Sequence, residues 1–136
     1  MKVLLDCDVI LDVAIGRTQF LSDSSRVLDW CEQHNGGGII AWHTLANTYY
    51  VLRKQKSDTL AREFIHDLID FMEVAASGTP EAKHALAMEI GDFEDALQVA
   101  VAVHAGVDCI ITRNIRHYRS APISAIPPSD FIARNA

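Results

Sequence analysis

The sequence has no apolar run long enough to cross a bilayer. A membrane-spanning helix needs roughly 20 consecutive apolar residues, and even the apolar stretch from Ala96 to Ala105 is interrupted by Gln98 and His104. We therefore expect no association with the membrane interior.

Cysteine is also scarce. The three cysteines, Cys7, Cys31 and Cys109, are odd in number and far apart, and no positively charged leader with a cleavage site precedes them. These features do not fit the disulfide framework of a small secreted domain. We expect a cytoplasmic protein with reduced thiols.

Basic side chains are fewer than acidic ones, with 12 Lys and Arg against 18 Asp and Glu and a net charge of −6. Nonspecific affinity for nucleic acid comes mainly from Lys and Arg that neutralise phosphates, so this balance argues against an extended basic groove. It does not exclude a nucleic-acid site, because acids gathered around a metal ion make the total charge negative while the bound cation reverses the local sign.

What is present fits one globular domain. The chain has 136 residues, 49% of them hydrophobic, without repeats or low-complexity segments. A domain typically spans roughly 50 to 200 residues around one core, so we expect a single domain over residues 1–136.

Short apolar runs alternate along this chain with stretches of helical periodicity. Glycines at 16, 36–38, 91 and 106 separate them, and Thr79-Pro80-Glu81 is typical of a helix start. Such alternation predicts an α/β fold: a three-layer α/β/α sandwich with a mostly parallel sheet of about five strands. The expected strands are 3–5, 38–41, 74–76, 107–112 and 123–126, and the later helices are 79–90, 92–105 and a short one after 128.

Carboxylates follow the first strand and open a later helix. Asp6 comes directly after an apolar run, and Asp92 and Asp95 lie three residues apart in a first helical turn. That spacing puts both on one face, with Glu94 expected to point elsewhere. Capping and the helix dipole also favour acids in a first turn, so a purely structural role remains an alternative, above all for Asp92.

These acids fit a site for a hard cation. In open α/β sheets ligands bind outside the carboxyl ends of the strands, where Asp6, Asp95 and Asn114 are all expected. Mg²⁺ and Mn²⁺ prefer oxygen ligands and need only one or two direct carboxylates when a phosphate supplies others. Hydrolysis of a phosphate ester is the chemistry that such a site predicts.

Three segments in this order resemble the PIN-domain family of metal-dependent ribonucleases, whose small prokaryotic members include VapC-type toxins. Residues 3–12 are similar to the first family motif, residues 92–98 to the motif with the third family acid at Asp95, and residues 110–114 to the late strand with its T-x-D ending. The resemblance implies a PIN-like fold and Mg²⁺- or Mn²⁺-dependent cleavage of RNA.

The chain departs from that family pattern at three positions. Asn47 stands where the second acid is usual, Asn114 stands at the fourth, and Asp8 replaces a usual Asn. Loss of charge at two positions should weaken a cation site unless other acids compensate. We expect Asp92 and Asp8 to do so, in a rearranged site.

The resemblance implies roles for individual residues. Asp6 and Asp95 would bind the metal directly, Asp92 directly or through water, and these three are the candidate catalytic residues. Four residues would orient ligands, water or phosphate from behind: Asp8, Asn47, Thr112 and Asn114. Arg113 and Arg116 are candidate RNA contacts, although a solvated loop is an alternative. We expect His43 to be a cap or surface residue and Asp12 to pair with Arg17 or solvent.

Two other interpretations remain at this point. Asp6-Cys7-Asp8 also resembles the start of haloacid-dehalogenase-type phosphatases, with Asp6 as nucleophile, but their late acidic motif follows a strand, whereas residues 81–90 have helical spacing. The second alternative is a PIN fold that serves as a binding or assembly module. From the resemblance alone, the expected partners are RNA, a second copy in a homodimer, and a small antitoxin.

Overall fold

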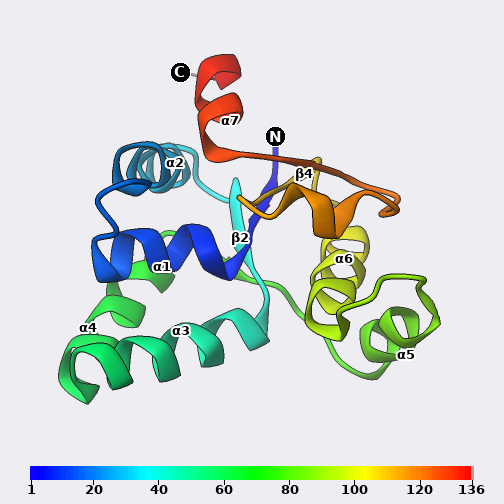
Figure 1. The fold of residues 1–136 in the computed structure, drawn as a ribbon, viewed down its shortest axis with the longest axis horizontal. Helices are drawn as coiled ribbons and strands as arrows, with labels where there is room; N and C mark the ends of the chain where they lie inside the picture. The colour runs from blue at the N-terminus through cyan, green and yellow to red at the C-terminus, as the bar shows by residue number, and fades with distance from the viewer. Residues whose placement is uncertain (136) are drawn as a thin grey trace.

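The central sheet has five parallel strands in the computed structural model, which describes residues 1–135. The strand order is β3-β2-β1-β4-β5, so β1 occupies the centre (Figure 1). Leu4 of β1 is in register with Ile39 of β2 and with Ile110 of β4. The strands are β1 (Val3–Leu5), β2 (Gly38–Ile40), β3 (Glu73–Val74), β4 (Cys109–Ile111) and β5 (Ser124–Ile126).

Helices cover both faces of this sheet, which confirms the three-layer prediction. In Figure 1 the helices α1 to α4 lie on one side of the strands, and α5 and α6 lie on the other. The helices are α1 (Cys7–Ile15), α2 (Leu21–Gln33), α3 (Trp42–Gln55), α4 (Asp58–Ile69), α5 (Thr79–Ala87), α6 (Phe93–Ala105) and α7 (Pro128–Asn135), with a 3-10 helix η1 (Ile115–Tyr118). Among residues 1–135, no helix is long and apolar enough to cross a membrane.

The core consists of two layers because side chains alternate between the faces of each strand. Val3 and Leu5 pack into the layer that includes α1, α2 and α7, whereas Leu4 packs into the layer that includes α6. All three side chains are fully buried. A strand buried on both faces is an unbroken apolar run, which is why the sequence pattern located β1 correctly.

Capping explains why a helix starts directly after β1 and again at α6. Asp6 caps α1 by accepting from the backbone N–H of Cys7, and Asp92 caps α6 by accepting from that of Asp95. Gly16 and Gly106 end the same two helices in the left-handed conformation, which glycine adopts without strain. The predicted capping role of Asp92 is confirmed.

The ends of β2 to β5 differ from the sequence-based expectation by one or two residues, and two larger features differ as well. Helix α5 ends at Ala87, because Met88 is extended, and Met88 and Ile90 pack against the α6 layer from a non-helical segment. The turn after β4 contains η1, which was not expected. Apolar residues spaced three or four positions apart are typical of a helix. An extended segment that packs against the core can have the same spacing, so the pattern alone did not show where α5 ends.

The topology fixes where a site can form. The chain leaves β1 for β2 on one side of the sheet and later returns to place β4 on the other side. This reversal of strand order beside β1 is a topological switch point, and ligands bind at such points outside the carboxyl ends of the strands. Asp6 and Thr112 are the residues that follow β1 and β4 there.

Candidate active site

Asp6 is held by hydrogen bonds on both carboxylate oxygens and is only 4% exposed. Its Oδ1 accepts from the backbone N–H of Cys7 at 2.7 Å and from Nε2 of Gln98 at 3.1 Å. Its Oδ2 accepts from the hydroxyl of Thr112 at 2.8 Å and from that of Tyr118 at 3.0 Å. Four donors therefore fix the orientation of this carboxylate before any ligand arrives.

The donors themselves are fixed by the fold. Thr112 is fully buried after β4, and its hydroxyl oxygen accepts from the backbone N–H of Asn114 at 3.0 Å. Gln98 is fully buried in α6 and also donates to the hydroxyl of Thr44 in α3 at 3.1 Å. Helices from both layers thus meet at Asp6.

Tyr118 connects Asp6 to Asp95. Its buried hydroxyl lies 3.0 Å from Oδ2 of Asp6 and 3.2 Å from Oδ1 of Asp95. A hydroxyl has a single proton, so it donates to one carboxylate at a time. Burial, together with the charges of Asp6 and Asp95, raises the pKa of Tyr118, which therefore stays a neutral donor.

The first turn of α6 gathers three carboxylates. Oxygens of Asp92, Glu94 and Asp95 lie within 4.8 Å of one another. The expectation that Glu94 points elsewhere was wrong, because its longer side chain turns back toward Asp95. Burial, followed by the charges of Glu94 and Asp92, raises the pKa of Asp95 to about 6. Capping and clustering therefore occur together in this turn.

Two histidines border these acids. Nε2 of His43, at the start of α3, lies 3.2 Å from Oε1 of Glu94, and Nδ1 of His117 lies 3.0 Å from Oδ2 of Asp95. His43 is half-buried at the site rather than a simple surface residue. Both imidazoles add positive charge beside the acids only when protonated.

Asp8 brings a further carboxylate to the same end of the sheet. Its Oδ2 accepts from the backbone N–H of Arg113 at 3.0 Å, whereas its Oδ1 is buried with no partner in the described part of the chain. Burial, followed by the charge of Asp6, raises the pKa of Asp8 to about 6. An orphaned carboxylate oxygen beside other acids is a position that a cation or its water would satisfy.

The donor set suits a hard divalent cation. The acids gathered here offer carboxylate oxygens as metal ligands, and Mg²⁺ and Mn²⁺ prefer oxygen ligands. Burial, followed by repulsion from the neighbouring acids, raises the pKa of both Asp8 and Asp95. A bound cation would relieve that repulsion, so these residues fit the metal that the sequence predicted.

Arg113 is engaged on the far side of this cluster. Its guanidinium donates to both oxygens of the fully buried Asp12, at 2.9 and 3.0 Å, and lies 3.7 Å above the ring of Phe20. Asp12 also pairs with Arg17 at 3.3 Å, as expected, and accepts from Ser24 at 2.9 Å. The Arg113 side chain is thus committed to Asp12, and its backbone N–H serves Asp8.

The two asparagines, Asn47 and Asn114, are not fully buried; Asn47 lies on α3, and Asn114 directly precedes η1. Asn47 is half-buried one helical turn after His43, on the same side of α3. Asn114 is exposed, and its backbone rather than its side chain makes contacts, to Thr112 and to the N–H of His117. Neither asparagine side chain orients Asp6.

A surface cleft of about 460 Å³ opens beside Asp95. Its lining includes three acids and three basic side chains: Glu89, Asp92, Asp95, Arg116, His117 and Arg119. A phosphate could approach the acids here with cations beside it, provided that a metal ion neutralises the carboxylates. A separate hollow of about 550 Å³ lies by Phe20 and Arg113 and contains no acid of the cluster.

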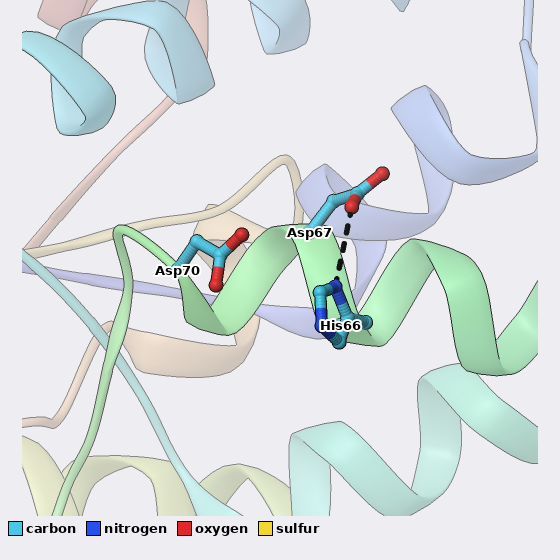
Figure 2. A group of neighbouring side chains, drawn as sticks. All are labelled: His66, Asp67 and Asp70. Atoms are coloured by element: carbon cyan, nitrogen blue, oxygen red, sulfur yellow. Dashed lines mark hydrogen bonds and ion pairs between the residues drawn. The ribbon is translucent and has the colours of Figure 1, made fainter.

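A second group of metal-ligating side chains lies at the end of α4. Figure 2 shows His66, Asp67 and Asp70, with a dashed line from His66 to Asp67, whose Nδ1 and Oδ1 are 3.5 Å apart. All three are exposed. Solvated charges at the end of a helix explain this group.

Sequence reasoning missed four contributors: Thr44, Glu94, Gln98 and Tyr118. Gln98 carried a usable signal, since an amide within an otherwise apolar helical face requires a partner. Tyr118 carried none, because its position depends on the unexpected 3-10 turn. The phosphatase alternative loses its basis here, because helix α5 and an extended segment, not a strand, precede Asp92.

Comparisons with known proteins agree with this architecture. A family model described as PIN domain matches residues 2–116. A toxin-antitoxin complex from Klebsiella pneumoniae superposes with a TM-score of 0.72 at 18% identity, covering 93% of this chain and 98% of that one. DNA-bound VapBC from Salmonella typhimurium gives 0.71 at 17%, covering 94% and 98%.

A third solved structure is VapC20 of Mycobacterium tuberculosis, described as a sarcin-ricin loop cleaving toxin. It superposes with a TM-score of 0.65 at 14% identity, covering 80% of this chain and 87% of that one. At identities this low, the structural likeness shows a shared fold. No curated protein matches the sequence.

Proposed function

The chain belongs to the PIN domain family, and from this premise we propose that it is a metal-dependent endoribonuclease that hydrolyses RNA phosphodiester bonds. One observation carries the proposal. Asp6 and Asp95, from elements on either side of the switch point, share the Tyr118 hydroxyl beside a cleft with acidic and basic linings.

In this proposal Asp6 and Asp95 bind Mg²⁺ or Mn²⁺ directly, and Asp92 binds directly or through water. The ion, when bound, would polarise the phosphoryl oxygen, activate water and offset charge on the leaving oxygen. Asp8, whose Oδ1 is buried without a partner in the described residues, would accept a hydrogen bond from water at the site. Glu94 supplies negative charge that Asn47 cannot.

The other candidate residues would support the metal ligands or contact the phosphate. Thr112 orients Asp6 through its hydroxyl, and Asn114 keeps Thr112 in place through its backbone N–H. Asn47, on α3, would orient water or the scissile phosphate through its amide. Because Arg113 is engaged by Asp12, the phosphate contact passes to Arg116, with His117 beside it in the cleft.

Cleavage of a structured RNA with an unpaired loop tests this proposal. We expect the full chain to cleave it in Mn²⁺ or Mg²⁺ and to stop in EDTA, and Asp95→Asn to slow cleavage at least 100-fold. Asp70→Asn, an exposed acid at the end of α4, is the matched control and should cleave at the wild-type rate. Equal activity in wild type and Asp95→Asn would indicate a contaminant and refute the proposal.

We further propose that the protein is the toxin of a toxin-antitoxin pair, acting in the cytoplasm as a homodimer of single-domain chains spanning residues 1–136. The solved toxin-antitoxin complexes that share its fold support this proposal. A small antitoxin would cover the acidic pocket. Expression of the wild-type chain should then arrest bacterial growth, and Asp95→Asn should not. Growth that is equally impaired by both would contradict a nuclease toxin.

A non-catalytic binding or assembly module is the second candidate. It is favoured by the four hydrogen bonds that already occupy both oxygens of Asp6. A ligand that binds the folded state raises its stability. A module that binds no metal would therefore gain no thermal stability from Mn²⁺, and it would not cleave RNA. The same protein preparation therefore distinguishes the two candidates.

A further inference from the structure

Three polar side chains form a chain of contacts across the two helices α5 and α6. Oε2 of Glu81, in the first turn of α5, lies 2.5 Å from Nδ1 of His104, in the last turn of α6. Nε2 of His104 in turn lies 3.1 Å from Nδ1 of His84, also on α5. None of these residues belongs to the acidic cluster, which occupies the other end of α6.

Glu81 determines which nitrogen of His104 carries the proton. Glu81 is 7% exposed, and its Oε1 accepts from the backbone N–H of Gly78 at 2.7 Å. That bond, together with the one from His104, lowers the pKa of Glu81, so the carboxylate is ionised and only accepts. In the neutral form of the His104 ring, Nδ1 therefore holds the proton, and the lone pair of Nε2 points to Nδ1 of His84.

We propose that His84 and His104 form a Zn²⁺ site, with Nδ1 of His84 and Nε2 of His104 as ligands and water molecules completing the coordination. Zn²⁺ bound to histidine at 2.0–2.1 Å in a tetrahedral site separates two ligand nitrogens by about 3.3–3.4 Å. The observed 3.1 Å separation needs only a small opening to admit the ion.

The surroundings of the two rings fit this assignment. A histidine that binds a metal usually donates its other ring N–H to a carboxylate, which fixes the tautomer and raises the basicity of the ligating nitrogen. Glu81 is placed to accept this hydrogen bond from Nδ1 of His104. The His104 side chain is 33% exposed, so an ion can reach it from solvent. To bind the ion, His84 would adopt the tautomer with its proton on Nε2, which leaves the lone pair of Nδ1 free.

The ion would link two helices that pack closely through short side chains. Where α5 meets α6, the buried core is built from the alanines Ala85, Ala96 and Ala100, which bury little apolar area each. Because the ligands are imidazole nitrogens, this site favours Zn²⁺, whereas the acidic cluster favours hard cations. The two sites are therefore separable by experiment.

Titration of the full chain with Zn²⁺ at pH 7.5, in a buffer that does not bind zinc, tests the inference. We expect one site, seen by calorimetry and as a rise in Tm. His84→Gln and His104→Gln should each weaken binding more than 10-fold, and Glu81→Gln about 10- to 100-fold. His66→Gln, which removes the exposed histidine of Figure 2, and Asp95→Asn should leave the affinity within twofold.

Several results would overturn the inference. They are the absence of zinc binding by the wild type, unchanged affinity in His84→Gln and His104→Gln, or loss of affinity in His66→Gln or Asp95→Asn. Should the histidine variants not fold, nitrogen NMR of the wild type decides: one equivalent of Zn²⁺ must shift the resonances of His84 Nδ1 and His104 Nε2. Shifts at His43, His66 or His117 instead would refute the site.

Discussion

The Tyr118 hydroxyl lies between two carboxylates that would hold the proposed metal ion. It is 3.0 Å from Asp6 and 3.2 Å from Asp95, and all three residues are buried. A neutral donor offsets only part of the repulsion between two carboxylates, whereas a divalent ion offsets it fully. Tyr118 is therefore a residue that stabilises the metal-free protein and competes with the metal.

Tyr118→Phe should show both effects. Without metal, the variant lacks the single donor that Asp6 and Asp95 share, so we expect the free energy of unfolding to fall by about 1–3 kcal/mol. With saturating Mn²⁺, the ion supplies the missing charge, so the Mn²⁺-dependent rise in stability should exceed that of the wild type. Urea unfolding in EDTA and in Mn²⁺ measures both quantities. A smaller Mn²⁺ effect in the variant would contradict competition between the hydroxyl and the metal.

The raised pKa of Asp95 makes stability depend on pH in a definite direction. A carboxyl group with a folded-state pKa of about 6, against an ordinary 3.8, binds its proton more tightly in the folded protein. Its stabilising contribution is present below about pH 4 and is lost as pH rises through 6. Asp8 acts in the same direction.

Asp95→Asn should therefore be more stable than the wild type at pH 7.5 in EDTA, and the difference should shrink as pH falls to 5. Mn²⁺ competes with the same protons, so the wild-type gain from Mn²⁺ should decrease over that interval. Thermal unfolding of both proteins at four pH values, with and without Mn²⁺, provides the measurement. A difference in stability between the two proteins that does not change with pH would contradict a raised pKa of Asp95.

At the scale of elements, Arg113 joins the turn after β4 to helix α1. The guanidinium holds both oxygens of Asp12, and the backbone of the same residue holds Asp8 one turn earlier in α1. The position of Asp8 in the site thus depends on an ion pair behind it. Asp12 keeps only Arg17 and Ser24 when Arg113 is removed.

Arg113→Ala should lower the free energy of unfolding by about 3 kcal/mol, because removal of one partner leaves a buried charge poorly compensated. Arg116→Ala, at an exposed position in η1, should change it by less than about 0.5 kcal/mol. Chemical denaturation of the two variants gives the comparison. Although Arg116→Ala should leave stability almost unchanged, it should cleave RNA more weakly than the wild type. Its cleavage should also depend less steeply on salt concentration. Equal destabilisation by both substitutions would contradict the role of the Asp12 pair.

The elements most accurately predicted from sequence were those whose local signals agreed with their tertiary setting. Strand β1 was an unbroken apolar run, and α6 had both Asp92 as its cap and Gly106 at its end. Helix α5 was predicted too long, because Met88 and Ile90 are apolar for reasons of packing across the core. No local pattern marked η1, and Tyr118 was missed with it.

At the scale of the whole molecule, topology turned distant residues into one site. Parallel order around β1 could be predicted from alternation of elements, and it implied that Asp6 and residues after β4 share an edge. The direction of each side chain could not be predicted. Glu94 joins the acids although only Asp92 and Asp95 were expected to share that face, and the guanidinium of Arg113 turns away although Arg113 comes soon after β4.

The central claim is that these acids hold a divalent cation on which RNA cleavage depends. It is tested most directly by following cleavage and thermal stabilisation of the same protein over one Mn²⁺ titration. We predict that both rise with the same half-maximal Mn²⁺ concentration, that both are lost in Asp95→Asn, and that both persist in Asp70→Asn. Cleavage that continues in EDTA, or a midpoint for cleavage unrelated to that for stabilisation, would contradict the account.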